Sequence, residues 1–293
     1  MSNPHAEWRI QFARRLTDRF TGYQDIQAIV VAGSVARGFT DEYSDLELPI
    51  FWDELPSDDT RLAIIEDLGG DFLNAYDGPS REDQLLIDGV QVDLWHVPLV
   101  YQEQVIEAVL AGERSDLSSL NALDTIRSCI PLFGQGIVQD WKKRAEAFPD
   151  VLALRIIQEH LPSFSLGELV LHAQRGNPTA YYSQLVHLQE EVFLVLLALN
   201  RCYFPTFKWL YHTLEKMTIK PKEIGNRFQQ AFSESPEAAA ANMKGILLET
   251  LDLVKETYPE IDVARDLRRL NYQRTAHPKE GPSGSTGKAS EER

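Results

Sequence analysis

Two short segments carry the residue types that phosphate and metal chemistry needs. Gly33-Ser34 follows a β-branched run, and Asp45-Leu46-Glu47 follows after ten intervening residues. A glycine lets the backbone approach a phosphate closely, and a serine at a helix start offers a hydroxyl and an N–H where the helix dipole favours anions. On a strand, Asp45 and Glu47 point to the same face, so their carboxylates repel each other unless a divalent cation lies between them. Mg²⁺ suits that position because it takes oxygen ligands and bridges to phosphates.

A third acid, Asp93, lies in the segment Val92-Asp93-Leu94, whose alternation of apolar and polar residues is typical of a strand. A neighbouring strand could bring its carboxylate to the same site. There it would serve either as a third metal ligand or as the base for an attacking hydroxyl.

Local patterns predict the elements that would position these residues. The run over 26–31 predicts a buried strand that ends at the Gly33 turn, and alternation over 43–52 predicts a half-buried strand. Asp88-Gly89, between apolar runs at 84–87 and 90–97, is the strongest short signal for a hairpin. Helical periodicity predicts two further elements, over 5–21 and 57–68.

From about residue 100 the pattern becomes helical, and no further strand is expected. The predicted helices cover 101–111, 117–130, 136–147, 150–175, 178–201, 206–217, 221–232, 237–257 and 260–272. Residues 276–293 are rich in Gly, Ser, Lys and Glu and predict a disordered tail. The sequence therefore predicts an α/β part followed by an all-helical part, with the boundary within 98–150.

The composition is typical of a globular protein, with 293 residues, 43% of them hydrophobic and 25% charged. No run of about 18 apolar residues could span a membrane, and no apolar leader is visible. The two cysteines, Cys129 and Cys202, fit neither a disulfide framework nor a thiolate metal site. We expect a cytoplasmic protein without a membrane partner.

The negative charge is unevenly placed along the chain. The net charge is -15, and residues 1–150 hold 27 acidic and 12 basic side chains, which accounts for all of it. Such a field repels polyanions and attracts cations, so a nucleic-acid partner is disfavoured and a cationic small molecule is favoured.

The segment from Ala32 to Leu48, AGSVARGFTDEYSDLEL, resembles the signature of the DNA polymerase β-like nucleotidyltransferase superfamily. The Tyr-Ser-Asp-Leu-Glu form is most similar to the branch that modifies aminoglycoside and lincosamide antibiotics. The resemblance implies an α+β fold, in which a nucleotidyltransferase domain with a small mixed sheet and flanking helices precedes an all-helical domain. We expect these domains over 1–115 and 116–275, with the tail over 276–293.

The resemblance also implies roles for the residues that match the motif. Ser34, beside Gly33, would hold the β- and γ-phosphates, and Asp45 and Glu47 would bind Mg²⁺, with two ions expected. Asp93 matches the third acidic position and would be a metal ligand or the general base. The implied reaction has an acceptor hydroxyl attacking the α-phosphate of a nucleoside triphosphate, with ATP expected as the donor and pyrophosphate leaving.

A triphosphate carries more negative charge than two Mg²⁺ ions cancel, so basic side chains are needed as well. Arg37 is the one basic residue inside the motif, and the segment 200–209 supplies Arg201 and Lys208 among aromatic residues. We hypothesise that this segment clamps the phosphates.

These observations predict a metal-dependent nucleotidyltransferase that acts on a hydroxyl of a small molecule, with an aminoglycoside-like antibiotic among the candidates. One alternative is a toxin-like nucleotidyltransferase that modifies tRNA or protein, which would need a basic docking surface. Another is a binding module with a dead site, although all three carboxylates, Asp45, Glu47 and Asp93, are present.

Overall fold

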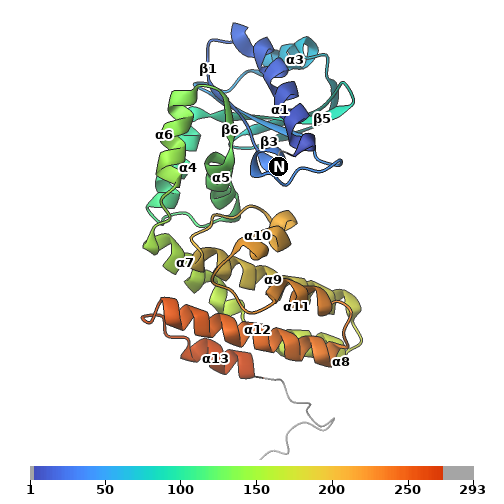
Figure 1. Ribbon diagram of the computed structural model, residues 1–293, viewed down its shortest axis with the longest axis vertical. Coiled ribbons are helices and arrows are strands. Elements are labelled where there is room, and N and C mark those ends of the chain that lie inside the picture. The colour runs from blue at the N-terminus through green and yellow to red at the C-terminus, as the bar shows by residue number, and fades with distance from the viewer. Residues whose placement is uncertain (1–2, 273–293) are drawn as a thin grey trace, which may run out of the picture. The chain divides into compact units, whose positions relative to one another are not determined.

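A six-stranded mixed sheet, ordered β3-β4-β5-β2-β1-β6, organises the first half of the chain (Figure 1). The computed structural model describes residues 3–272, so the predicted tail over 276–293 lies outside the described residues. The strands are β1 Ile26–Val31, β2 Leu46–Trp52, β3 Asp71–Asp77, β4 Arg81–Ile87, β5 Val90–Pro98 and β6 Ile130–Phe133. β2 and β5 run parallel, and the other neighbouring strands pair antiparallel. The α+β fold class predicted from the sequence is confirmed.

Thirteen α-helices accompany the sheet in the described residues. They are α1 Pro4–Thr17, α2 Gly33–Arg37, α3 Asp58–Asp67, α4 Leu99–Leu110, α5 Leu117–Ser128, α6 Gln135–Ala145, α7 Asp150–His160, α8 Gly167–Gln174, α9 Pro178–Leu199, α10 Leu210–Lys216, α11 Ile224–Gln230, α12 Pro236–Thr257 and α13 Ala264–Asn271. Three 3₁₀ turns, η1 Asp18–Gly22, η2 Leu161–Ser163 and η3 Phe207–Trp209, complete the chain. None of the helices that the structure describes is long and apolar enough to cross a membrane.

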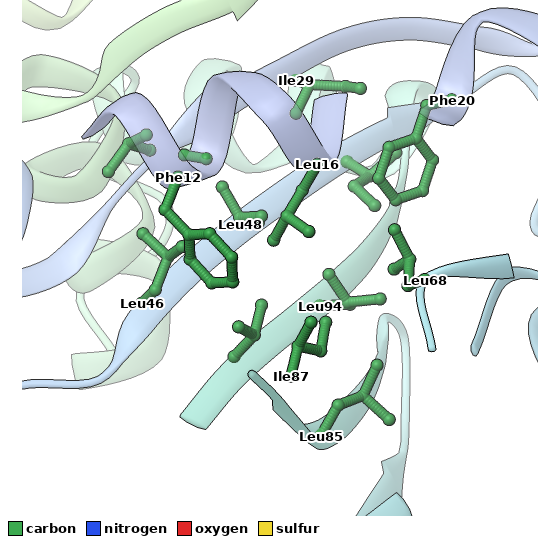
Figure 2. Packing of buried hydrophobic residues seen from close by; sticks show 14 of the residues in the cluster. Phe12, Leu16, Phe20, Ile29, Leu46, Leu48, Leu68, Leu85, Ile87 and Leu94 are labelled. Atoms are coloured by element: carbon green, nitrogen blue, oxygen red, sulfur yellow. The ribbon is translucent and has the colours of Figure 1, made fainter. Parts of the chain in front are cut away.

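One face of the sheet packs against α1 and α3. Phe12 and Leu16 of α1 lie over Leu46 and Leu48 of β2, and Leu94 of β5 continues the same apolar layer (Figure 2). Successive strand residues point to opposite faces, which is why the even-numbered positions of β2 fill this core. The three leucines of the strands are fully buried, and each contributes about 1.5–3 kcal/mol through the removal of apolar surface from water.

A buried charged network fastens α3 to this face of the sheet. The Arg61 guanidinium on α3 donates to both carboxylate oxygens of Asp83 on β4, at 2.5 and 2.9 Å. His96 Nε2 lies 3.2 Å from Asp83 Oδ2, and its Nδ1 accepts a hydrogen bond from Trp52. Burial raises the pKa of Asp83, but the hydrogen bonds from His96 and Arg61 outweigh it and lower the pKa to about 2.

The opposite face is partly covered by α4 and α6, which contact β5 and β1. Trp141 of α6 packs edge-on against Phe51 of β2, with ring centres 4.7 Å apart, and its indole N–H donates to Glu103 of α4. The odd-numbered positions of β2, which include Glu47, belong to this second face. It is therefore the face that carries the acids singled out from the sequence.

The local predictions near the site are confirmed. Asp88 and Gly89 both have positive φ, 51° and 80°, as a two-residue hairpin turn between β4 and β5 requires. Ser57 caps α3 by accepting a hydrogen bond from the Thr60 N–H, and the strand over 26–31 lies where it was predicted. The strand predicted over 43–52 begins only at Leu46, so Asp45 lies just before β2 and not on it.

Two strands were not predicted. β3 is an exposed edge strand between acidic residues, with little apolar alternation to signal it. The expectation of no strand beyond residue 100 is wrong, because β6 pairs with β1 through Pro131 and its neighbours. Proline is tolerated there because β6 is an edge strand, where one N–H of the ladder is free to be absent.

By contacts the chain divides into two compact units, one of residues 3–160 and 193–219 and the other of residues 161–192 and 220–272. The division predicted at residues 115 and 116 stays a prediction. In the second unit α12 contacts α8, α11 and α13, and buries Met243, Ile246, Leu247, Leu251 and Val254. All residues of the candidate site lie in the first unit.

Candidate active site

Strand pairing places the Gly33-Ser34 turn beside Glu47. β1 runs antiparallel to β2, so the end of β1 meets the start of β2. The Ala32 N–H, one residue past β1, donates to the carbonyl of Glu47 at 3.0 Å. α2 therefore begins next to the acidic strand.

Gly33 is required because the Glu47 side chain occupies the space of a side chain at that position. A Cβ built on Gly33 would lie 1.7 Å from Glu47 Oε2, far inside contact distance. The φ of Gly33, +61°, is also in the region that only glycine adopts freely. We expected this glycine to admit a phosphate, and the structure shows that it admits the Glu47 carboxylate.

The Ser34 hydroxyl is buried in the turn that begins α2. The residue is 4% exposed, and its Oγ has no hydrogen-bond partner within residues 3–272. Its carbonyl accepts from the Phe39 N–H and the Thr40 hydroxyl, which fixes the turn. An unsatisfied buried hydroxyl costs free energy of order 1–3 kcal/mol, which a bound acceptor atom would recover.

The parallel pairing of β2 and β5 aligns two of the three acids. Glu47 and Asp93 are register partners on these strands, so their side chains stand next to each other on the same face. Asp45 precedes Glu47 by two residues, and its charge acts on both carboxyls. Burial raises the pKa of Glu47 to about 7, and the negative charge of Asp45 adds to the effect.

Asp93 is held by amide groups of its own sheet. Gln91 Nε2 donates to Asp93 Oδ1 at 3.1 Å, and Gln84, the register partner of Asp93 on β4, also bonds to it. Burial raises the pKa of Asp93 to about 6, against the opposing effect of the Gln91 bond, and the Asp45 charge raises it further. The residue is buried, with 6% of its surface exposed.

The donor chemistry of the three acids fits a divalent cation. Their oxygens are the ligands that Mg²⁺ prefers, and the charge of Asp45, which adds to the effect of burial in raising the pKa of Glu47 and Asp93, is one that a cation would offset. Across residues 3–272, however, no three His, Cys, Asp or Glu side chains are grouped so that they could hold a metal ion as they stand. The predicted metal site therefore rests on the donor types and on their mutual repulsion.

Two of the three predicted cations lie near these carboxylates. The positive charges of Arg37 and Lys208 both lower the pKa of Glu47, and Lys208 acts in the same way on Asp41. Lys208 is exposed on η3, whereas Arg37 is largely buried and donates to Asp124 Oδ2 at 2.7 Å. Arg201 instead forms an ion pair with Asp150 and donates to the Phe148 carbonyl, so the structure does not bring it to the acids.

An aromatic cluster connects the motif to the segment that carries Lys208. Phe39, just past α2, lies 4.9 Å from Trp209 and 5.2 Å from His212 between ring centres. Thr206, the residue before η3, has φ of 90°, a strained value for a β-branched side chain that costs of order 1–3 kcal/mol. The packing of Trp209 on Phe39 holds the strained segment in place. The packing of Phe39 against Trp209 and His212 was not predicted from the sequence, although Phe39 lies inside the motif.

Comparisons with known proteins give limited matches. A family model described as "Domain of unknown function (DUF4037)" matches residues 130–210. A search of curated protein sequences finds no match.

Two solved structures are similar at low identity. A nucleotidyltransferase-like protein from Exiguobacterium sibiricum 255-15 is 14% identical, with 86% of this chain and 80% of that chain covered and a TM-score of 0.40. The Cid1 poly(U) polymerase is 15% identical, with 54% and 48% covered and a TM-score of 0.27. The TM-scores lie below 0.5 and the family model spans less than half of the chain, so the function is argued from the site itself.

Proposed function

We propose that the protein is a metal-dependent nucleotidyltransferase that moves the nucleoside monophosphate of ATP to a hydroxyl of a small molecule. The observation that carries the proposal is that a buried serine hydroxyl and a pair of neighbouring carboxyl groups lie next to each other. A buried serine hydroxyl without a partner in residues 3–272 lies on the turn beside Glu47, and Glu47 stands in register with Asp93. A phosphate-binding group next to crowded carboxylates is what transfer to or from a nucleoside triphosphate needs.

The chain supplies groups that would bind the triphosphate and groups that would bind the metal ion. Ser34 would donate its hydroxyl to a phosphate oxygen, and Lys208 and Arg37 would balance the charge of the triphosphate. Asp45, Glu47 and Asp93 would hold Mg²⁺, which, when bound, neutralises charge on the phosphate oxygens and lowers the pKa of the attacking hydroxyl.

In the transfer step the acceptor oxygen forms a bond to the α-phosphorus, and the bond from that phosphorus to the bridging oxygen breaks. Pyrophosphate leaves with the electron pair of that bond. Asp93, whose carboxylate accepts hydrogen bonds from Gln91 and Gln84, would take the proton of the acceptor hydroxyl or serve as a metal ligand.

The acidic first half supports a cationic acceptor, such as an aminoglycoside, because carboxylates around a cleft attract ammonium groups. Transfer to tRNA or protein would use the same carboxylates and is the second arm of the test. The protein would be incubated with Mg²⁺ and ATP, GTP, CTP or UTP, together with aminoglycosides, lincosamides or bulk tRNA, and pyrophosphate release would be measured.

The Asp45→Asn variant keeps the shape of the side chain but removes its charge, so we expect turnover to fall by about 10²-fold or more. Glu66→Gln, on the exposed side of α3, is the matched control and should leave turnover unchanged. Pyrophosphate release that persists in Asp45→Asn would show that the chemistry does not use this site.

A further inference from the structure

A cavity of about 610 Å³ lies beside Arg37, which lines it and pairs with Asp124. It is an open cavity lined by residues of α2, α5 and the segment 200–218, all within the first compact unit. Its volume is within the range of small-molecule sites. Ser34, Asp45, Glu47 and Asp93 do not line it, so it is distinct from the carboxylate cluster.

The cavity is cationic, in contrast to the acidic first half of the chain. Arg37, Arg127 and Lys216 line it together with a single acid, Asp124. Arg37 is committed to Asp124, with its Nε 2.7 Å from the carboxylate. Arg127 and Lys216 form no ion pair with any acid of the described residues, and Arg127 makes only a long bond, 3.5 Å, to the Arg201 carbonyl.

The two cations without an ion pair in the described residues, Arg127 and Lys216, lie near aromatic side chains. Lys216 Nζ lies 4.2 Å from the centre of the Phe39 ring, and the positive charge of Arg127 lowers the pKa of Tyr203, which burial raises. Phe39, Tyr203 and Met217 line the same cavity. A ligand that satisfies both parts must combine an anionic group with a flat or apolar group.

The other polar groups around the cavity are already paired. Asn200 donates to the carbonyls of Leu196 and Ile219, while its oxygen accepts from the N–H groups of Thr218 and Ile219. Recognition is therefore left to the two cations and the rings, an arrangement that suits a phosphate attached to an aromatic base.

We propose that this cavity binds a nucleoside monophosphate unit, with Arg127 and Lys216 holding the phosphate. The unit is either a free mononucleotide or the terminal nucleotide of an RNA strand. The choice of a nucleotide over other ring-bearing phosphates rests on the proposed function, because Arg37 lines the cavity and its charge also acts on Glu47. The binding itself needs neither the carboxylates nor a divalent cation.

The test is a calorimetric titration of the full chain with AMP in the presence of EDTA, which removes divalent cations. We expect AMP to bind the wild type and Asp45→Asn with equal affinity. Binding should weaken by about tenfold or more in Arg127→Ala/Lys216→Ala, because each lost charge-assisted bond to a phosphate costs about that much. Lys143→Ala/Lys222→Ala removes two exposed charges elsewhere and should bind as the wild type does.

Adenosine and inorganic phosphate, titrated alone, should each bind at least about tenfold more weakly than AMP, because each uses one part of the cavity. A short RNA with a free 3′ end that displaces AMP would identify a strand end as the source of the unit. Failure of that RNA to compete would identify the free nucleotide. Both results require AMP to bind in the first place.

Three results would overturn the proposal. The first is that AMP does not bind, and the second is that phosphate binds as tightly as AMP. The third is that Asp45→Asn loses AMP binding while Arg127→Ala/Lys216→Ala keeps it. Because Arg127 and Lys216 are exposed, the melting temperature of the double variant should match the wild type. If the double variant melts at a lower temperature, AMP affinity is measured instead in the single variants Arg127→Gln and Lys216→Gln, and each should bind AMP more weakly than the wild type. Pyrophosphate release with Mg²⁺ on the same preparations tests the proposed function separately, since AMP binding in EDTA does not depend on it.

Discussion

The contact between Gly33 and Glu47 gives the most specific prediction of the site. Alanine at position 33 would place its Cβ 1.7 Å from Glu47 Oε2, and the Glu47 carboxylate would have to move. The backbone strain of alanine at a φ of +61° adds about 1–2 kcal/mol. A carboxylate at the end of a flexible side chain can swing away at small cost, so most of the lost stability comes from the backbone.

A matched control separates the two effects. Gly69 has nearly the same φ, +64°, but a Cβ built there meets nothing within 4 Å. Gly69→Ala should therefore lose about 1–2 kcal/mol of stability and keep full turnover. Gly33→Ala should lose a similar amount of stability, while turnover falls by about 10²-fold because Glu47 no longer stands beside Asp93.

Both variants would be compared by urea unfolding and by pyrophosphate release with the substrates found for the wild type. The reasoning about Glu47 fails if Gly33→Ala turns over like Gly69→Ala. It also fails if the loss of turnover in Gly33→Ala merely follows the fraction of unfolded protein.

Three further predictions concern charge and packing. Because the pKa of Asp83 is lowered to about 2, its share of the stability is complete above about pH 4 and is lost as the pH falls toward 2. The raised pKa values of Glu47 and Asp93 act in the opposite sense, so the quantity to measure is the difference in urea-unfolding free energy between the wild type and Asp83→Asn. That difference should shrink by an amount approaching about 2 kcal/mol between about pH 5 and 2.5, and a constant difference would contradict the reasoning. Lys208→Glu should weaken nucleoside triphosphate binding by about tenfold or more in calorimetry, whereas Lys143→Glu, a charge reversal on the exposed part of α6, should not. Trp141→Ala, which empties a fully buried site against Phe51, should cost about 3–5 kcal/mol of unfolding free energy, and a cost near that of a surface substitution would show that the second face of the sheet is not packed as described.

The elements around the carboxylates could be predicted because their signals are local. A two-residue turn at Asp88-Gly89 and a β-branched run before Gly33 are readable from a few adjacent residues. The alternation over 43–52 also predicted the strand that carries Glu47, although Asp45 lies before its first residue. The pairing of Glu47 with Asp93 depends on the order of the strands, so the residues suggested that Asp93 could reach the site but did not establish which strand it would lie beside.

The surroundings of the cations could not be predicted, because they depend on contacts between distant segments. Nothing near Arg37 indicates that Asp124 of α5 will hold it, and nothing near Arg201 indicates Asp150. β6 was missed for a related reason, since its proline opposes strand formation locally and the strand forms by pairing with the distant β1.

The parallel pairing of β2 and β5 also bears on when the site can exist during folding. β4 and β5 are joined by a tight turn and can associate early, whereas β2 must close a long crossover that includes α3 before it lies beside β5. Glu47 and Asp93 come together only at that later step. A chain whose helices and hairpin have formed, but whose central strand has not docked, has no aligned carboxylates and would be unable to capture substrate prematurely.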